Sequence, residues 1–410
     1  MSSTRLYPRT ALAVLTALNL LNYIDRSVLF SVQPLVQSEF HLSNAQAGYL
    51  TSAFFLFYMV AAPITGPLAD RYSRKLLIVI GAFIWSGATL LTAVAHSYDT
   101  LLVRHILVGI GEASFVTISP TFVSDLFPQK NRGRILGIFY MAIPVGTAIG
   151  YLAGRLGTMY RWQTPFLVAG APGFALALMM IFIPEPERGS QDTTRETPDR
   201  GKVLGLLRNP AYWTATLGLA SMTFALGGLQ VWMPTFLSRV RGYSLDRANL
   251  VFGGITAFDG TVASLAGGWL GDRMLRRTKN AYYLLSAVSM ALGVPVMILA
   301  LFTSGRAMLP SILVAEFLVL LNTSPLNAAL INSVNAHIRA TAIAFNIFLI
   351  HLLGDVPSPA IIGYIADHHS FEVAFICPVV ALVISSAILF YGMRFAPPVV
   401  STDYGVASSQ

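Results

Sequence analysis

Twelve apolar stretches recur along the sequence, and each is long enough to cross a bilayer as one helix. A membrane-spanning helix needs about 20 mostly apolar residues. The stretches are residues 10–34, 44–67, 76–95, 100–124, 133–155, 163–183, 211–237, 248–271, 281–303, 308–330, 340–366 and 371–395. Only helices and closed barrels satisfy their backbone groups within lipid. The pattern therefore predicts an all-α membrane protein with twelve transmembrane helices.

The composition supports a membrane setting and excludes several functions. Of the 410 residues, 55% are hydrophobic and 11% are charged, whereas a soluble domain has about 25% charged residues. The net charge of +8 does not indicate nucleic-acid binding, because the basic residues lie in short connections between apolar stretches. The sequence has no P-loop and no metal-ligand cluster. We expect no cofactor and no enzymatic activity, and Cys377 alone cannot form an internal disulfide.

The longest polar connection divides the chain into two halves. Residues 184–210 are rich in Pro, Gly, Ser and mixed charge, which is typical of a linker. We predict a six-helix bundle over 1–183, a cytoplasmic linker over 184–210, a second bundle over 211–395 and a cytoplasmic tail over 396–410. The first stretch resembles a secretory signal, but it is longer than the roughly 7–15 residues of a signal core and carries Asp25 and Arg26. We interpret it as a retained helix.

The basic residues predict the orientation of the helices. If the N-terminus is cytoplasmic, nineteen of the 27 Lys and Arg residues face the cytoplasm and six face outward. All four lysines then lie inside, as the positive-inside rule requires. Both termini are therefore expected in the cytoplasm.

Two short motifs repeat in the two halves. The pattern G-x-x-x-D-R follows the second stretch at 66–71 and the eighth at 268–273. Gly-Tyr-Leu-Ala at 150–153 is matched by Gly-Tyr-Ile-Ala at 363–366. Paired motifs in the same order indicate duplication and pseudo-symmetric bundles. In transporters built from parallel repeats, the substrate site lies near the midplane between the halves.

These motifs resemble known transporters. The segment GPLADRYSRK (66–75) is similar to the signature loop of the major facilitator superfamily. The segments NYIDR (22–26), GEASFVTISPTFVSDLF (111–127), FYMAIPVGTAIGYLAG (139–154) and HLLGDVPSP (351–359) resemble the spinster family. The resemblance implies alternating-access transport of single-chain lipids such as lysophospholipids, often with proton coupling. It also implies a monomer, and the short tails are typical of a bacterial member in the inner membrane.

The resemblance has one departure. The family places an arginine seven residues before the glutamate of its GEAS motif, but this chain has His105 there and Arg104 one residue earlier. Because helical residues advance by about 100° each, His105 nearly shares a face with Glu112 and Arg104 does not. We therefore include His105, and not Arg104, among the candidate residues.

Ionisable residues inside the apolar stretches are the main functional candidates, because each costs at least about 2.5–3.5 kcal/mol at the bilayer centre. Asn19, Asn22, Asp25 and Arg26 form a polar wedge of roughly 120° on the first helix. We predict that this wedge handles substrate or protons. The alternative is a fixed Asp25–Arg26 pair or hydrogen bonds between helices.

Further buried acids follow along the chain. Glu112 lies near the middle of the fourth stretch, where burial disfavours its charge and a nearby cation would favour it. We predict a role in proton or substrate handling; a permanently neutral acid is the alternative. In the second half, Asp355 can meet His351 on one helical face. The roles of Asp259 and Glu316 stay open between function and packing.

The two copies of the loop motif are candidate gates on the cytoplasmic side. The residues are Gly66, Asp70, Arg71, Arg74, Asp125, Asp272 and Arg273. In the superfamily such loops hold the inward gate shut, and Asp125 is a possible partner for the first copy. The alternative is that the basic residues only set the orientation.

The predicted function is proton-coupled transport of an amphipathic lipid, with protons and the bilayer as partners. The alternative is a proton-driven transporter of drugs or small metabolites on the same scaffold. A lipid tail needs apolar lining, for which the sequence offers Phe30, Phe54, Phe57, Tyr58, Phe115, Trp232 and Phe236. The direction of transport is not predicted.

Overall fold

The computed structural model describes residues 3–188, 205–334 and 338–396, and this part of the chain is built from helices. The helices of the first half are α1 (Ser3–Phe40), α2 (Asn44–Arg71), α3 (Arg74–Thr92), α4 (Tyr98–Leu126), α5 (Gln129–Tyr140), α6 (Ala142–Met159) and α7 (Thr164–Ile181). Those of the second half are α9 (Pro210–Arg239), α10 (Leu245–Leu275), α11 (Ala281–Phe302), α12 (Met308–Leu320), α13 (Thr323–Asn332), α14 (Arg339–Ile350), α15 (Ser358–His368), α16 (Phe371–Ala374) and α17 (Ile376–Gly392). Short 3-10 turns, η1 (Gly305–Ala307) and η4 (Met393–Phe395), and a π-helical turn, η3 (His351–Asp355), complete the described elements.

Eleven helical passages in the described residues are long and apolar enough to cross a membrane. Four of them combine consecutive elements: α5 with α6, α12 with α13, α14 with α15, and α16 with α17. The 38-residue α1 is not among the eleven, because Asn19, Asn22, Asp25 and Arg26 make it more polar. With α1 counted, the structure contains the twelve passages that the sequence predicts.

Side-chain caps fix the starts of several helices. Ser43 accepts a hydrogen bond from the Gln46 N–H, and the Gln46 side chain bonds back to the Ser43 N–H, which makes a capping box at the start of α2. Asn209 accepts from the Tyr212 N–H at the start of α9. These bonds satisfy backbone donors that have no partner within the helix.

Two prolines interrupt the α-helix of the eleventh passage. In a regular α-helix, the N–H groups of residues 357 and 359 would bond to the carbonyls of Leu353 and Asp355. Both positions are proline, so these bonds cannot form. The chain instead makes the π-helical turn η3, in which the Val356 N–H donates to the His351 carbonyl at 3.0 Å. The turn divides the passage into α14 and α15 and turns His351 and Asp355 toward each other.

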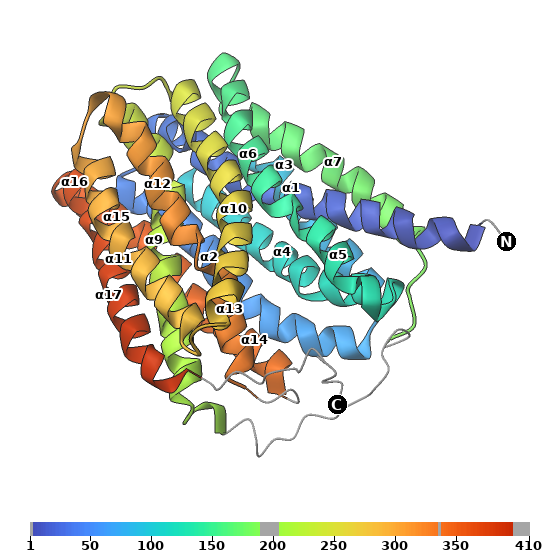
Figure 1. Cartoon of the computed structure of the whole chain (residues 1–410). Helices are drawn as coiled ribbons and strands as arrows, with labels where there is room; N and C mark the ends of the chain where they lie inside the picture. The colour runs from blue at the N-terminus through green and yellow to red at the C-terminus, as the bar shows by residue number, and fades with distance from the viewer. Residues whose placement is uncertain (1–2, 189–204, 335–337, 397–410) are drawn as a thin grey trace, which may run out of the picture.

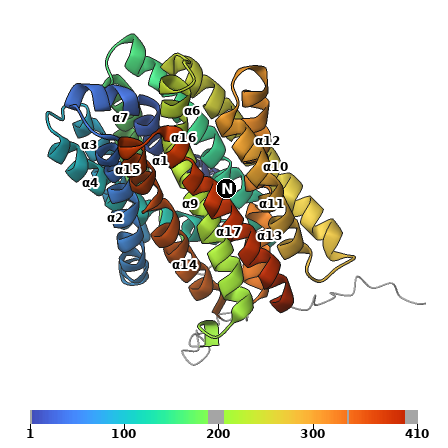
Figure 2. The same cartoon turned by 90° about the vertical axis from the view of Figure 1, so that its left-hand side faces the viewer.

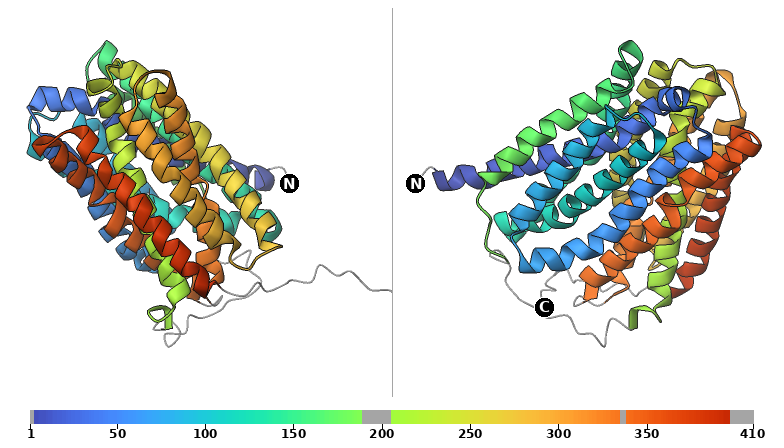
Figure 3. Two further views of the ribbon diagram at one scale, coloured as in Figure 1. Left: turned by 60° about the vertical axis from the view of Figure 1, so that its left-hand side comes forward. Right: turned by 180° about the vertical axis from the view of Figure 1, so that it is seen from behind.

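The helices of each half group together. Figure 1 and Figure 2 show α1–α7, coloured blue to green, gathered beside α9–α17, coloured light green to red. The two views of Figure 3 show the long helices of both halves side by side, running in roughly the same direction, so that together they form one layer. One buried apolar cluster lies within the first half around Trp85, Phe115 and Phe122. A larger cluster joins both halves through residues such as Val28, Tyr151 and Trp232.

We call the side of this layer at which α7 ends and α9 begins the linker side and the opposite side the far side. On the far side, Asp367 at the end of α15 accepts hydrogen bonds from the backbone N–H groups of Asn44 and Ala45, at 2.8 and 2.7 Å. These are free donors at the positive start of α2, so a carboxylate is favoured there. Nearby, Asn249 of α10 donates to the Ser31 carbonyl of α1 at 2.8 Å. The two halves are therefore joined on the far side.

Glycine allows this close junction. A Cβ added to Gly48 of α2 would lie 2.4 Å from the Pro359 carbonyl oxygen of α15. A Cβ added to Gly363 of α15 would lie 2.4 Å from the Asn44 carbonyl oxygen of α2. Gly363 begins the second Gly-Tyr-x-Ala motif, so this copy has a packing role between the halves.

Candidate functional site

The centre of the site is an ion pair between α1 and α4. Arg26 Nε donates to Glu112 Oε2 at 2.7 Å, and the two side chains are 10% and 0% exposed. Asn22, one helical turn before Arg26, lies beside the Glu112 carboxylate and is fully buried. The mutual attraction in such a pair counters the large cost of desolvating each charge, and removal of one partner would leave the other charge buried without compensation.

Aromatic rings surround the cation. The Arg26 guanidinium carbon lies 4.9 Å from the centre of the Tyr23 ring, 5.2 Å from that of Phe54 and 4.8 Å from that of Tyr58. Each distance is within the range of a cation–π interaction. The rings attract the cation and also exclude water, so the Arg26–Glu112 pair has a strong mutual attraction.

The second half contributes a polar pair to the same region. His351 Nδ1 lies 2.7 Å from Asp355 Oδ2, within the π-helical turn η3. The His351 ring stacks on Phe55 and contacts Tyr58 edge-on, with centroids 6.0 and 5.6 Å away. Tyr58 therefore contacts both Arg26 of the first half and His351 of the second half.

Gly227 of α9 makes room for this pair. A Cβ at Gly227 would lie 2.5 Å from Asp355 Oδ1, closer than real Cβ contacts allow. The His351–Asp355 arrangement therefore depends on a glycine from a third helix, which the sequence analysis did not single out.

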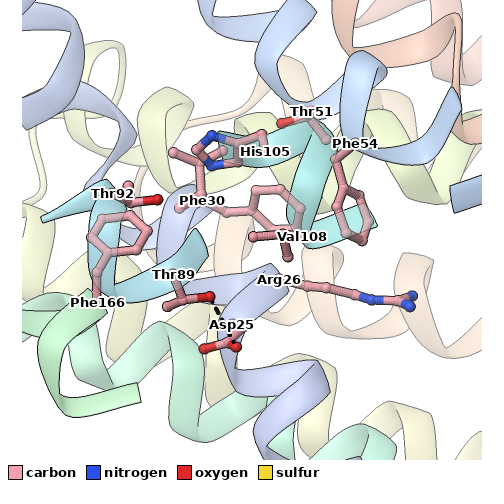
Figure 4. A pocket seen from close by; sticks show the side chains of 11 residues that line it. Asp25, Arg26, Phe30, Thr51, Phe54, Thr89, Thr92, His105, Val108 and Phe166 are labelled. Carbon is pink, nitrogen blue, oxygen red and sulfur yellow. Dashed lines mark hydrogen bonds between the residues drawn. The ribbon is translucent and has the colours of Figure 1, made fainter. Parts of the chain in front are cut away.

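Asp25 lines one pocket together with its neighbour Arg26, but its side chain points the other way. Its Oδ2 accepts a hydrogen bond from Thr89 Oγ1 of α3 at 3.2 Å, and the Arg26 side chain points away from it (Figure 4). The pocket lies within the first half, and its lining includes Asp25, Thr92, His105 and Phe166. Arg26 pairs with Glu112 and not with Asp25, so this structure does not show the fixed Asp25–Arg26 pair that was the alternative interpretation of the wedge.

Two further members of the predicted set lie in well-defined places. His105 is buried, and its Nδ1 lies 2.8 Å from the Leu101 carbonyl of its own helix. His105 lines the same pocket as Asp25, whereas the Glu112 carboxylate forms the ion pair with Arg26. Asn19 donates to the Phe139 carbonyl of α5 at 3.0 Å. For Asn19 the structure favours the alternative of a hydrogen bond between helices.

The first copy of the loop motif forms an ionic cluster on the linker side. Arg74 donates to Asp125 Oδ2 at 2.5 Å and to Glu185 Oε1 at 3.4 Å. Glu185 also accepts from Ser73 Oγ and from the backbone N–H groups of Arg74 and Lys75. Burial raises the pKa of Glu185, but these hydrogen bonds outweigh it and hold the pKa below its usual value. The cluster fastens residues after α7 to the start of α3.

Other residues of this copy make fewer contacts. Asp70 and Arg71 are exposed, and Arg188 donates to the carbonyls of Asp70, Ala69 and Tyr72 at the end of α2. A Cβ at Gly66 would meet no atom within 4 Å. The gating role of this loop stays a prediction. The sequence analysis missed Glu185. The feature that could have indicated it is the position of this acid at the start of the polar linker.

The second copy of the motif is simpler. Asp272 accepts from the Tyr282 hydroxyl at 2.7 Å, and the Arg273 guanidinium lies 5.6 Å from the Trp269 ring centre. Among the described residues, neither belongs to an ion pair. The two copies share a sequence pattern but not a set of contacts.

The aromatic residues proposed for a lipid tail separate into groups. Phe54 and Tyr58 lie against Arg26, and Phe30 lines the pocket of Asp25. Phe57 is partly exposed. The remaining three, Phe115, Trp232 and Phe236, are fully buried in the apolar clusters. Those three pack the helices together.

Comparison with known proteins defines the class. The family model of the Major Facilitator Superfamily matches residues 15–354. A bacterial homologue of the human lysosomal transporter spinster, crystallised in an inward-facing and unoccupied conformation, has the same fold, with a TM-score of 0.86 and 24% identity over 95% of this chain and 98% of that one. The chain belongs to the major facilitator superfamily of transporters and is a multi-pass integral membrane protein.

Curated relatives define the family within it. Protein spinster homolog 1 of Xenopus tropicalis is 35% identical, and the match covers 87% of this chain and 73% of that protein. Sphingosine-1-phosphate transporter SPNS2 of Danio rerio is 35% identical over 88% of this chain and 76% of that protein. The chain is a member of the spinster family, a class of transporters and not of enzymes.

Proposed function

We propose that this chain couples the movement of protons to the transport of a lysophospholipid or a similar single-chain amphipathic lipid. The observation that carries the proposal is the Arg26–Glu112 pair, a buried charge set among Tyr23, Phe54 and Tyr58. A lipid with one tail and an anionic head needs a cation beside apolar surface. A related transporter of zebrafish carries sphingosine-1-phosphate in its name, which is a lipid of this kind.

Protonation of Glu112 supplies the coupling. While Glu112 is charged, it neutralises Arg26 and leaves little attraction for an anionic head group. A proton on Glu112 removes that counter-charge, so Arg26 then favours the head group of the substrate. Loss of the head group restores the ion pair and expels the proton. Asp25, whose Oδ1 has no hydrogen-bond partner, is a second proton carrier in the pocket that it lines together with Arg26 and His105.

Transport in liposomes tests this proposal. A lysophospholipid panel is offered with and without a pH gradient to the wild type, Glu112→Gln, Asp25→Asn and the control Asp99→Asn. Asp99 is an exposed carboxylate in the first turn of the helix that carries Glu112. We expect both buried variants to lose gradient-driven accumulation and the control to keep it.

The two parts of the proposal can fail separately. Accumulation by both buried variants in response to a pH gradient would exclude them as the coupling site. Transport of cationic drugs or polar metabolites by the wild type, with no lysophospholipid transported, would replace the lipid by the alternative substrate class.

We also propose that the linker side faces the cytoplasm of a bacterial inner membrane. The excess of Lys and Arg on the linker side supports this orientation. In oriented vesicles, Lys75 and Lys279 should react with a membrane-impermeant amine reagent from the cytoplasmic side, while reaction from the outside would reverse the topology. With this orientation, the joined far side corresponds to an inward-facing transporter.

A further inference from the structure

Two buried carboxylates in the second half make no ion pair among the described residues. Asp259 of α10 is fully buried, and neither of its carboxylate oxygens has a hydrogen-bond partner. Glu316 of α12 is buried, and its Oε1 accepts from Thr256 Oγ1 at 2.9 Å while Oε2 has no partner. The two acids lie close enough for their charges to interact. Three of four carboxylate oxygens are therefore buried without a bond.

Among the described residues that line the space beside Glu316, none carries a positive charge. A small cavity beside Glu316 is lined by Gln230 and by apolar side chains of α9, α10, α11 and α12. From α6, across the contact between the halves, Tyr151 approaches Glu316 and donates to the Gln230 carbonyl at 2.7 Å. Tyr151 is the titratable group that the first half presents to the pair. None of the residues that line the cavity is Lys, Arg or His.

The carboxylate pair also lies close to the junction of the two halves, where α6 packs on α10. A Cβ at Gly260, the residue after Asp259, would lie 3.4 Å from Pro144 Cβ of α6. Phe252 and Gly253 of α10 pack on the Tyr151 ring. Separation of α6 from α10 would therefore open a path for water to the pair.

We propose that Asp259 and Glu316 form a second proton site, which holds at least one proton while α6 and α10 are in contact and loses it when they separate. Two unpaired negative charges cannot remain side by side in a buried apolar setting, so a proton must neutralise at least one. A metal ion is a poorer fit, because Ca²⁺ takes about six to eight oxygen ligands and this site offers the side chains of Thr256, Asp259 and Glu316. The site goes beyond the proposed function, which assigns protons to Asp25 and Glu112.

Infrared difference spectroscopy on the reconstituted protein tests the site without any substrate. The carbonyl stretch of a protonated carboxyl group is recorded through a pH titration for the wild type, Asp259→Asn, Glu316→Gln, Glu112→Gln and Asp99→Asn. We expect loss of a neutral-pH band in Asp259→Asn and in Glu316→Gln, and its retention in the other two variants. Retention of every band in both second-half variants overturns the proposal, and so does a band that Na⁺ abolishes at constant pH.

A conservative change covers the case in which a carboxylate variant fails to fold. Thr256→Val keeps the volume of the side chain but removes the donor to Glu316, so the band should shift in frequency and remain present. An unchanged band in Thr256→Val excludes Glu316 as its source. The Glu112→Gln spectrum separates this site from the proposed function, because that variant tests the first-half site alone.

A reversible cross-link tests the link to the junction. The variant Pro144→Cys, Gly260→Cys is made in a Cys377→Ser background, because a Cβ at position 260 would lie 3.4 Å from the Cβ of residue 144, close to the 3.5–4.5 Å of a disulfide. Oxidation should hold α6 against α10 and raise the pH at which the band disappears by at least one unit, a tenfold higher proton affinity. Identical titrations before and after oxidation would show that the proton affinity of the site does not depend on the contact between α6 and α10, and would contradict that part of the proposal.

Discussion

Glu112 and Glu316, buried acids on equivalent helices of the two halves, have different partners. In the first half, Glu112 of the fourth passage is paired with Arg26 and enclosed by aromatic rings. In the second half, Glu316 of the tenth passage, the equivalent helix, receives one hydroxyl hydrogen bond and has the acid Asp259 as its ionisable neighbour. An acid with a fixed cation responds to whatever competes for that cation, such as an anionic head group. An acid without a cation responds to water and protons alone.

The two linker-side loops also differ, because the copy in the first half makes ion pairs and the copy in the second half makes a hydrogen bond to a tyrosine. Arg74 of the first copy joins two carboxylates, Asp125 and Glu185. Asp272 of the second copy bonds to a tyrosine hydroxyl. Duplication has therefore preserved the helices and the G-x-x-x-D-R pattern, while the charged network is concentrated in the first half.

Removal of Arg26 should give the largest effect on this comparison. Arg26→Ala leaves the fully buried Glu112 without its cation, and breaking a buried ion pair costs about 3–5 kcal/mol. Thermal unfolding in detergent should show a large loss of stability. The double variant Arg26→Ala, Glu112→Gln should recover part of that loss, because the uncompensated charge is gone. A single variant as stable as the wild type would show that the pair contributes nothing.

A substitution at Gly227 should give an intermediate effect by disturbing the second half's polar pair. In Gly227→Ala the added methyl group overlaps Asp355 Oδ1, and overpacking a core costs about 1–3 kcal/mol. Gly254→Ala is the matched control, because a Cβ there meets no atom within 4 Å. Unfolding midpoints should fall for the first variant and stay close to the wild type for the second. Equal unfolding midpoints for the two variants would mean that η3 shifts to make room for the methyl group without loss of stability.

The smallest effect should come from Glu185 and should depend on pH. Because its pKa in the folded protein is lowered, its contribution is present at neutral pH and is lost as the pH falls through that value. The side chain is 22% exposed, so Glu185→Gln should lose about 1 kcal/mol or less at pH 7.

Acidification provides the control for that measurement. The difference between wild type and Glu185→Gln should disappear well below the usual glutamate pKa of about 4.3. Glu187→Gln, at an exposed position two residues on, should match the wild type throughout. A difference for Glu185→Gln that persists in acid would point to packing and not to charge.

Some residues of the site could be predicted from the sequence and others could not. The polar wedge on α1 and the buried Glu112 were identified from their positions within apolar stretches, because isolated charge in lipid is costly. Which acid Arg26 would contact was not predictable, since Asp25 is its neighbour in sequence and Glu112 lies 86 residues away. Gly227 and Glu185 were missed, because their roles come from contacts with distant segments. The predicted domain limits stay predictions.

The sequence by itself determined the twelve passages, the duplicated motifs and the identity of the buried ionisable residues. These properties depend on hydropathy and on spacing along a helix, and both are local. The tertiary structure alone decided that Arg26 contacts Glu112, that Asp25 faces Thr89, and that Glu316 accepts a hydrogen bond from Thr256 and makes no ion pair among the described residues. Such pairings depend on how the helices are rotated and offset against one another. That geometry is set by the close packing of many side chains and by glycines such as Gly48 and Gly363.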